Sequence, residues 1–294
     1  MNPFLAPKRR PLVVGHRGVP ALHQENSLAG FRRAVALGLP AAELDVRLTA
    51  DGRAVVCHDN DLERLTGERV LLDELSWDRA SKLRLRRQLP MGTGPHGEAV
   101  VMRYDREEPL ALLDEVLAEV GDALALNVEL KLDLEHPFDT RVAPIAAEAI
   151  ERAGLADRVI VTSFDPRKLR LARKTRKGLA IGFCFDDGMF DLLGPRGRGW
   201  LGRVLEANVV GRILKTKLVG AEHTLVGPET VARLHARGVA IGTHTLFPLG
   251  STAGKPIAPA AATEAEVHRL VALGVDWIES DDGARLLDVV SRAP

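Results

Sequence analysis

The chain has 294 residues, with 40 Lys and Arg side chains against 40 Asp and Glu side chains, so its formal net charge is zero. A chain of this length buries a large apolar core, whereas zero net charge argues against a nucleic-acid-binding protein, which normally carries a basic excess. The only two cysteines, Cys57 and Cys184, lie within apolar runs, and this favours buried thiols over a disulfide framework. There is neither a signal-like apolar segment near the N-terminus nor a run of about 20 apolar residues, so we expect a cytoplasmic protein without a transmembrane segment.

Short apolar runs rich in Val, Ile and Leu alternate with longer segments of helical periodicity. The predicted strands, in chain order, are residues 11–15, 41–46, 54–58, 124–131, 158–163, 179–185, 207–211, 239–244 and 276–280. The predicted helices are residues 28–37, 110–120, 140–153, 166–177, 228–237, 264–273 and 284–291. Strands that alternate with helices indicate a parallel sheet, and about eight such units favour closure into a TIM (β/α)8 barrel.

One region departs from this alternation. Residues 59–108 are too long and irregular for a simple connection, with a short helical piece at 76–87 and a glycine-rich turn at 92–97. Connections longer than about 15 residues usually carry function or structure of their own. We therefore expect a single domain over residues 1–294, with a small insertion on the barrel rim after the third strand.

Polar side chains stand at the ends of four predicted strands. They are, in chain order, His16 and Arg17, Glu43 and Asp45, His58 and Asp59, and Glu129 and Lys131. Residues two apart on a strand point to the same face of the sheet. Because the C-terminal ends of the strands build the active site of a parallel barrel, we expect these groups to converge at one mouth.

Three of these residues, Glu43, Asp45 and Glu129, offer oxygen ligands and no sulfur. Inward carboxylates are costly to bury unless a cation neutralises them. An oxygen-only set suits a hard divalent cation, Mg²⁺ or Ca²⁺, better than zinc. A single carboxylate–lysine pair or a lone histidine would be read as structural, but four polar groups at strand ends favour a functional site.

The polar groups belong to four of six short motifs. The six motifs are His16-Arg17-Gly18, Gln24-Glu25-Asn26-Ser27, Glu43-Leu44-Asp45-Val46, Thr49-Ala50-Asp51-Gly52, Val55-Val56-Cys57-His58-Asp59 and Asn127-Val128-Glu129-Leu130-Lys131. In this order the motifs resemble those of the glycerophosphodiester phosphodiesterase family. The resemblance is dense over residues 12–66, resumes at about 108–165 and then thins, although Ser280-Asp281-Asp282 still looks similar.

The resemblance implies a TIM barrel with a small insertion after the third strand. It implies metal-dependent hydrolysis of glycerophosphodiesters to glycerol 3-phosphate and an alcohol. It assigns the metal to Glu43, Asp45 and Glu129, general acid and base catalysis to His16 and His58, and phosphate binding to Arg17 and Lys131. Imidazoles, with an ordinary pKa of about 6.5, suit both proton transfers. Which histidine is the acid stays open, as does the choice between direct attack by water and a cyclic phosphate intermediate.

The sequence departs from the family pattern near the predicted seventh and last strands. His244-Thr245-Leu246-Phe247 stands where the family often has Trp-Thr-Val-Asn, and Trp277 replaces a common glycine, which would narrow or reshape the barrel floor. Two alternatives therefore stay open: phospholipase D-type cleavage of a lysophospholipid, and a non-catalytic barrel that binds phosphodiesters. The intact histidines and acidic residues argue against the second.

The predicted helix at 166–177 carries a run of basic residues: Lys168, Arg170, Arg173, Lys174, Arg176 and Lys177. We interpret this run as a solvated outer face of the barrel, and the alternative is weak attraction to anionic lipid headgroups. From the resemblance, the expected partner is a small-molecule glycerophosphodiester. The zero net charge argues against a nucleic acid as the partner.

Overall fold

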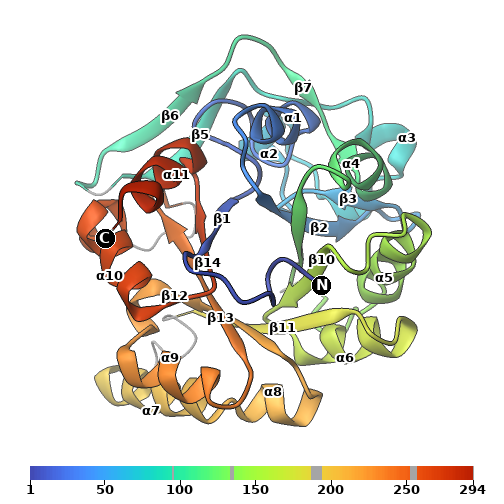
Figure 1. The fold of residues 1–294 in the computed structure, drawn as a ribbon. Coiled ribbons are helices and arrows are strands. Elements are labelled where there is room, and N and C mark those ends of the chain that lie inside the picture. Colours follow the sequence, from blue (N-terminus) through green and yellow to red (C-terminus); the bar gives the residue numbers. More distant parts are fainter. Residues whose placement is uncertain (95, 133–135, 187–193, 252–256, 294) are drawn as a thin grey trace.

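The computed structural model describes residues 1–94, 96–132, 136–186, 194–251 and 257–293, in which eight parallel strands close into a barrel (Figure 1). In chain order they are β1 (Leu12–Gly15), β2 (Ala41–Leu48), β9 (Ala125–Leu130), β10 (Val159–Ser163), β11 (Ala180–Phe185), β12 (Leu218–Glu222), β13 (Ala240–Leu246) and β14 (Trp277–Ser280). The barrel closes because β1 pairs in parallel with both β2 and β14. The predicted TIM barrel is confirmed.

Helices surround the barrel on its outer side (Figure 1). They are α1 (Leu28–Ala36), α4 (Leu113–Val120), α5 (Val142–Arg152), α6 (Pro166–Thr175), α7 (Gly194–Ala207), α8 (Val209–Leu214), α9 (Pro228–His235), α10 (Glu264–Leu273) and α11 (Gly283–Arg292), with short 3-10 helices at His223–Leu225 and Pro259–Ala262. In α1 the Ser27 hydroxyl accepts from the Gly30 N–H at the N-cap, and Phe31 and Ala34 are buried. Gly38, with a φ of 73°, then turns the chain toward β2.

The barrel is filled with apolar side chains near the amino ends of its strands. This inner cluster consists of Phe4, Val14, Ala41, Ala125, Ile160, Leu218 and Trp277. Phe4 comes from the N-terminal segment and packs edge-to-face on Trp277, with ring centroids 5.6 Å apart. The segment is held there by Asn2, whose Nδ2 donates to the Val159 carbonyl at 2.8 Å. Among the described residues, these side chains close the amino end of the barrel interior. The interior is therefore open to a ligand at the carboxyl ends of the strands.

The predicted third strand is real but is not a barrel strand. β3 (Ala54–Val56) runs antiparallel to β2, because the turn between them is far shorter than the dozen or so residues that a parallel crossover needs. The hairpin still returns the chain to the mouth, where the Cys57 N–H donates to the Asp45 carbonyl at 2.9 Å. His58 thus reaches the site from a returning strand.

Residues 59–108 contain short elements of their own, as predicted. These are α2 (Glu63–Thr66), a 3-10 helix (Leu72–Glu74), α3 (Trp77–Ala80), β4 (Arg84–Leu85), β5 (Gln88–Thr93), β6 (Ala99–Arg103) and β7 (Glu108–Pro109), after which β8 (Ala111–Leu112) pairs with β3. The helical piece predicted at 76–87 is too long, because β4 pairs with β7 instead. A separate apolar cluster that includes Leu62, Leu72 and Leu85 holds this insertion together.

The strand predicted at residues 207–211 is wrong. These residues end α7 and begin α8, and Asn208, with a φ of 45°, separates the two helices. A short apolar run fits a helix as well as a strand, and periodicity alone does not distinguish them. The barrel strand is β12, which includes the weak strand formers Gly220 and Ala221.

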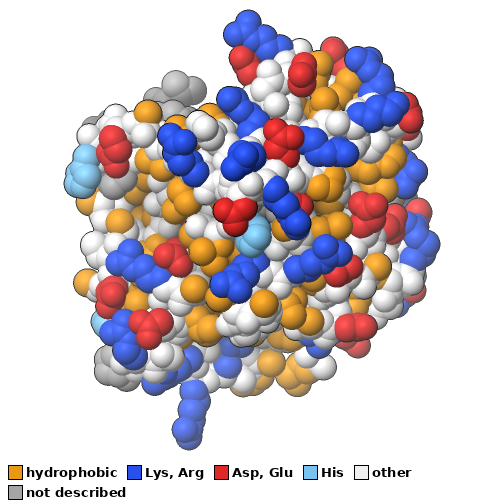
Figure 2. Space-filling view, turned by 90° about the horizontal axis from the view of Figure 1, so that it is seen from above, with side chains coloured by type: hydrophobic (Ala, Val, Ile, Leu, Met, Phe, Trp, Pro, Cys, Tyr) orange, Lys and Arg blue, Asp and Glu red, His pale blue; other side chains and the backbone are white. Residues whose placement is uncertain are grey.

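The surface shows both signs of charge. On the side that carries α1 and the insertion, basic and acidic side chains lie interspersed (Figure 2).

The basic run on α6 faces solvent only in part. Lys168 is 3% exposed, and its Nζ donates to the Lys131 carbonyl, so the assignment of Lys168 to the solvated face is wrong. Arg176 pairs with Glu151. Among the described helices, none is both long and apolar enough to cross a membrane.

Candidate active site

A cavity of about 320 Å³ opens at the carboxyl ends of the barrel strands. Five of the predicted site residues line it: His16, Arg17, His58, Glu129 and Lys131. The other two, Glu43 and Asp45, are buried: Glu43 contacts Arg17, and Asp45 contacts both Arg17 and Lys131. The structure therefore brings all seven predicted residues to one place.

The three acidic residues form a compact cluster. Asp45 on β2 stands in register with Glu129 on β9, and one carboxylate oxygen from each of Glu43, Asp45 and Glu129 lies within 4.8 Å of the others. Glu43 accepts from the Arg17 backbone N–H at 2.8 Å through Oε2, whereas its buried Oε1 has no hydrogen-bond partner in the part of the chain that the structure describes. Burial, reinforced by the charge of Asp45, raises the pKa of Glu43 well above its usual range. An unsatisfied, desolvated carboxylate within an oxygen-only cluster fits a hard divalent cation.

Two cationic side chains border this cluster. The Lys131 Nζ lies 2.8 Å from Glu129 Oε1 and 3.4 Å from Asp45 Oδ1. The Arg17 Nε lies 3.2 Å from Asp45 Oδ2. Burial alone would raise the pKa of Asp45, but Lys131 and Arg17 hold it below its usual range. These two cations therefore favour the ionised form of Asp45.

Each of the two histidines is oriented by a carboxylate. His16 Nδ1 lies 2.6 Å from Asp281 Oδ1, and its Nε2 lies 3.9 Å from Glu43 Oε2. His58 Nδ1 lies 2.7 Å from Asp59 Oδ1. Burial, together with the charge of Arg17, lowers the pKa of His58 to about 4. Because the Nδ1 atoms are occupied, the Nε2 atoms are the ones available for proton transfer.

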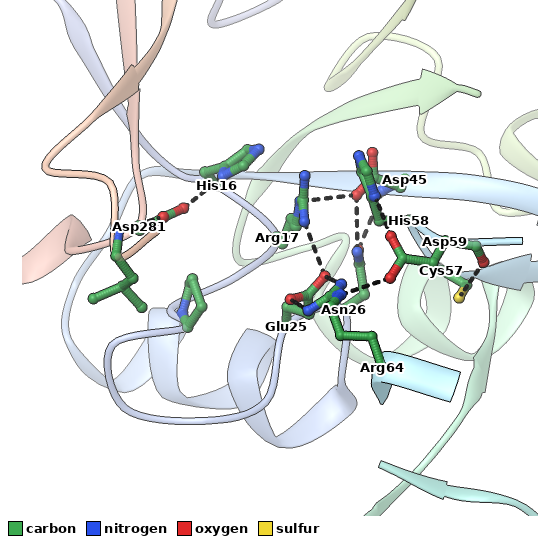
Figure 3. A network of polar contacts seen from close by, with 12 residues as sticks. His16, Arg17, Glu25, Asn26, Asp45, Cys57, His58, Asp59, Arg64 and Asp281 are labelled. Carbon is green, nitrogen blue, oxygen red and sulfur yellow. Dashed lines mark hydrogen bonds and ion pairs between the residues drawn. The ribbon is translucent and has the colours of Figure 1, made fainter. Parts of the chain in front are cut away.

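A chain of charged contacts links the second histidine to Arg17 (Figure 3). Arg64 Nε lies 2.6 Å from Asp59 Oδ2, and the same guanidinium donates to both oxygens of Glu25 at 2.8 Å. Glu25 Oε1 also accepts from Arg17 at 2.9 Å. Burial would raise the pKa of Glu25, but Arg17 and Arg64 lower it to about 2. This network fixes Arg17 and His58 relative to each other.

Several supporting residues are absent from the predicted set. Glu25 and Asn26 lie in one of the motifs quoted for the resemblance, and the Asn26 amide donates to Asp45 Oδ2 at 2.9 Å. Asp281 follows the last strand, within another familiar segment. Arg64 lies in the insertion, and nothing in the sequence pattern marks it. Motif membership could have identified the first three residues, but only the fold reveals Arg64.

The segment at the end of β13 contributes one new side chain to the cavity wall. His244 lines the cavity, packs edge-to-face with Phe164 at 6.3 Å between ring centroids, and has a pKa lowered to about 4 by burial. Its Nε2 has no hydrogen-bond partner among the described residues. Phe247 is buried away from the cavity, and Arg285 lies 4.0 Å above its ring.

Trp277 closes the floor of the cavity. Its indole lies across Gly242, where an added Cβ would come within 1.7 Å of the ring. The indole Nε1 donates to Glu279 Oε1 at 3.1 Å. Trp277 therefore fills the floor of the cavity, and Gly242 leaves the space for its ring.

The fold and the mouth together define a class, the (β/α)8-barrel enzymes, here with a carboxylate cluster that could hold a metal and two histidines beside it. The family model described as "Glycerophosphoryl diester phosphodiesterase family" matches residues 16–284, and the chain belongs to this family.

Individual relatives agree with this assignment. A glycerophosphodiester phosphodiesterase of Caldanaerobacter subterraneus is 30% identical over 184 residues, which cover 62% of this chain and 70% of the relative. The solved structure of an Oleispira antarctica phosphodiesterase superposes with a TM-score of 0.70 at 19% identity, covering 96% of this chain and 97% of that one. For a glycerophosphodiester phosphodiesterase from Parabacteroides distasonis the TM-score is 0.69 at 19% identity, over 98% and 100% of the two chains. The structural similarities show the shared fold.

Proposed function

We propose that this enzyme hydrolyses glycerophosphodiesters to glycerol 3-phosphate and an alcohol, with a divalent cation, Mg²⁺ or Ca²⁺. One observation carries the proposal: three carboxylate oxygens lie within 4.8 Å of one another, beside two histidines that line the same cavity. The Oleispira antarctica phosphodiesterase was solved in complex with the product sn-glycerol-3-phosphate, which supports the same product for this chain.

In this proposal Glu43, Asp45 and Glu129 hold the cation, which when bound neutralises charge on the phosphoryl oxygens. Arg17 and Lys131 bind the phosphate from the side of the cavity that they line. The buried carboxylates of Glu25 and Asp45 hold the side chains of Arg17 and Lys131 in place. The anion site is therefore organised before the substrate arrives.

The two histidines take the two proton transfers, one each. The nucleophilic hydroxyl loses its proton to one imidazole as the new P–O bond forms. The alkoxide leaves as the old P–O bond breaks and receives a proton from the other imidazole. Asp281 and Asp59 orient the rings through Nδ1, and this directs the Nε2 atoms of His16 and His58 to these transfers.

The test is release of glycerol 3-phosphate from glycerophosphocholine by the purified chain with Mg²⁺ or Ca²⁺. We expect His16→Ala and His58→Ala each to lower kcat by about 10²–10⁴-fold, which is the usual contribution of a general acid or base. We expect Glu43→Ala to abolish the metal-dependent rate. The matched control is His96→Ala, because His96 is exposed and lies outside the cavity. Full activity in all three site variants would refute the proposal.

Two further measurements address the alternatives that the sequence left open. A lysophospholipid in the same assay tests phospholipase D-type cleavage, and a clear preference for the deacylated diester excludes it. Cation binding without turnover of any phosphodiester would instead indicate a non-catalytic barrel.

A further inference from the structure

Glu279, on β14, is a buried carboxylate at the cavity floor that takes no part in the proposed cleavage. Its Oε1 accepts from Asn127 Nδ2 at 2.8 Å and from Trp277 Nε1 at 3.1 Å. Asn127 is itself oriented by the Thr162 hydroxyl, which donates to its Oδ1 at 2.8 Å. The carboxylate is therefore held by donors from two other positions in the barrel.

Both hydrogen bonds that Glu279 accepts from described side chains reach Oε1, and they leave the second oxygen, Oε2, unused. No hydrogen bond to Oε2 is found among the residues that the structure describes, and Glu279 lines the cavity with 5% of its surface exposed. Burial raises the pKa of this carboxyl to about 7. A buried carboxylate with an unused acceptor is costly, and a ligand that brings a hydrogen-bond donor removes that cost.

The charges around the cavity are divided between its two sides. Arg17 and Lys131 stand on the side of β1 and β9, where both contact Asp45. Within the described ranges, neither of them nor any other Lys or Arg forms an ion pair with Glu279. An anionic phosphate is attracted to the first side, whereas the floor offers another part of the same substrate a carboxyl group that no described Lys or Arg neutralises.

We propose that Glu279 binds a primary ammonium group on the alcohol moiety of the substrate, so that the enzyme prefers zwitterionic diesters of aminoalcohols. This inference rests on the proposed function. A primary ammonium brings both a positive charge and N–H donors to Oε2, which makes the hydrogen bond charge-assisted. A hydroxyl brings a donor without charge, and a trimethylammonium brings charge without a donor. The volume of about 320 Å³, at the small end for ligand sites, suits a compact headgroup.

The experiment compares kcat/KM for glycerophosphoethanolamine, glycerophosphoglycerol and glycerophosphocholine. For the wild-type enzyme we expect the ethanolamine diester to exceed each of the other two by about tenfold or more, as for sites that recognise a substrate N–H group. In Glu279→Gln, which keeps the shape and removes the charge, we expect that ratio to fall to about threefold or less. The matched control is Glu222→Gln, because Glu222 is a carboxylate on the wall of the same cavity. There the preference should persist.

The outcomes separate the two proposals. Equal kcat/KM values for the three diesters in the wild-type enzyme overturn the ammonium site, as does a preference that survives in Glu279→Gln. A preference lost only in Glu222→Gln also overturns the ammonium site.

If no diester releases glycerol 3-phosphate, the proposed cleavage fails. Calorimetric binding of glycerophosphoethanolamine against glycerophosphoglycerol then decides the ammonium site without turnover. If Glu279→Gln does not fold, Glu279→Asp, which retracts the charge, replaces it in both measurements.

Discussion

The two sides of the barrel mouth are built in different ways. On the side of β1, β2 and β9, two buried acids are held by cations and an amide: Glu25 contacts two arginines, and Asp45 contacts Arg17, Lys131 and Asn26. Among the described residues Glu43 Oε1 has no partner there, and it belongs to the cluster proposed to hold the cation. On the side of β13 and β14, His244 Nε2 has no hydrogen-bond partner among the described residues, and the two hydrogen bonds that Glu279 accepts both reach Oε1. Groups that are fixed before the substrate arrives suit chemistry, whereas unsatisfied polar atoms leave contacts for a ligand to complete. In the two proposals above, the first side is therefore the reactive side, and the second is where substrates are distinguished.

The largest expected effect is on the first side. Arg17→Met leaves Glu25 and Asp45 buried next to an apolar side chain, and removal of one partner from a buried ion pair typically costs about 3–5 kcal/mol. We expect a loss of this size in the free energy of unfolding by urea denaturation. Arg32→Met is the control, because its pair with Glu119 is exposed and should be worth about 1 kcal/mol or less. Similar losses in the two variants would show that the buried contacts of Arg17 contribute no more than an exposed ion pair.

A pH titration examines the same side through Glu25. Its pKa is about 2 in the folded chain, below the ordinary value of 4.5, so its contribution is complete above pH 4.5 and disappears as the pH falls toward 2. A shift of this size corresponds to on the order of 3 kcal/mol. We expect the difference in unfolding free energy between the wild-type chain and Glu25→Gln to narrow over this pH window. A difference that stays constant from pH 6 to pH 3 would show that Glu25 is not held by Arg17 and Arg64.

Removal of the cation provides the third comparison. A ligand at 100 times its dissociation constant stabilises the folded state by about 2.7 kcal/mol. We therefore expect Ca²⁺ or Mg²⁺ to raise the thermal unfolding midpoint of chelator-treated protein. Glu43→Gln should lose most of this increase, and Glu279→Gln should keep it. An equal loss in both variants would place the cation between the two sides and contradict the assignment to Glu43, Asp45 and Glu129.

The smallest effect is expected on the second side. Trp277→Phe removes one donor to Glu279 while keeping an aromatic ring against Phe4. A hydrogen bond to a charged group contributes about 1.5–3 kcal/mol, and the lower end is expected because Asn127 still donates to the same oxygen. Urea denaturation measures the loss. A loss as large as that of Arg17→Met would mean that the floor is as tightly organised as the reactive side.

The sequence predicts the residues on the β1, β2 and β9 side of the mouth much better than those on the β13 and β14 side. His16, Glu43 and Glu129 are recognisable because each is a polar side chain in or just after an apolar strand, and parallel strand ends meet at one mouth. Their supporting contacts are harder to predict, because the partners lie far apart along the chain: His16 and Asp281 are separated by 265 positions, and Arg64 comes from the insertion. Glu279 lies within the predicted strand at 276–280, but nothing local shows that its neighbours Asn127 and Trp277 share one oxygen.

The errors in the predicted fold have similar causes. β3 runs antiparallel to β2 because the turn between these two strands is short. The apolar character of a strand alone does not show whether it pairs in parallel or antiparallel. The strand predicted at 207–211 and the true strand β12 have comparable short apolar runs, so the choice between them depends on which one fits between β11 and β13. Pairing in the closed sheet decides both cases.

The seam of the barrel joins the two ends of the chain, since β1 pairs with β14 and Arg10 donates to the Val290 carbonyl at 2.8 Å. The same seam orients His16 through Asp281 and places Glu279 in the floor. During synthesis on the ribosome, the acidic cluster of β2 and β9 emerges long before these residues do. A nascent chain that stops short of β14 therefore carries the acids of the reactive side but lacks Asp281, which orients His16, and Glu279 in the floor. The proposed activity thus depends on nearly complete translation.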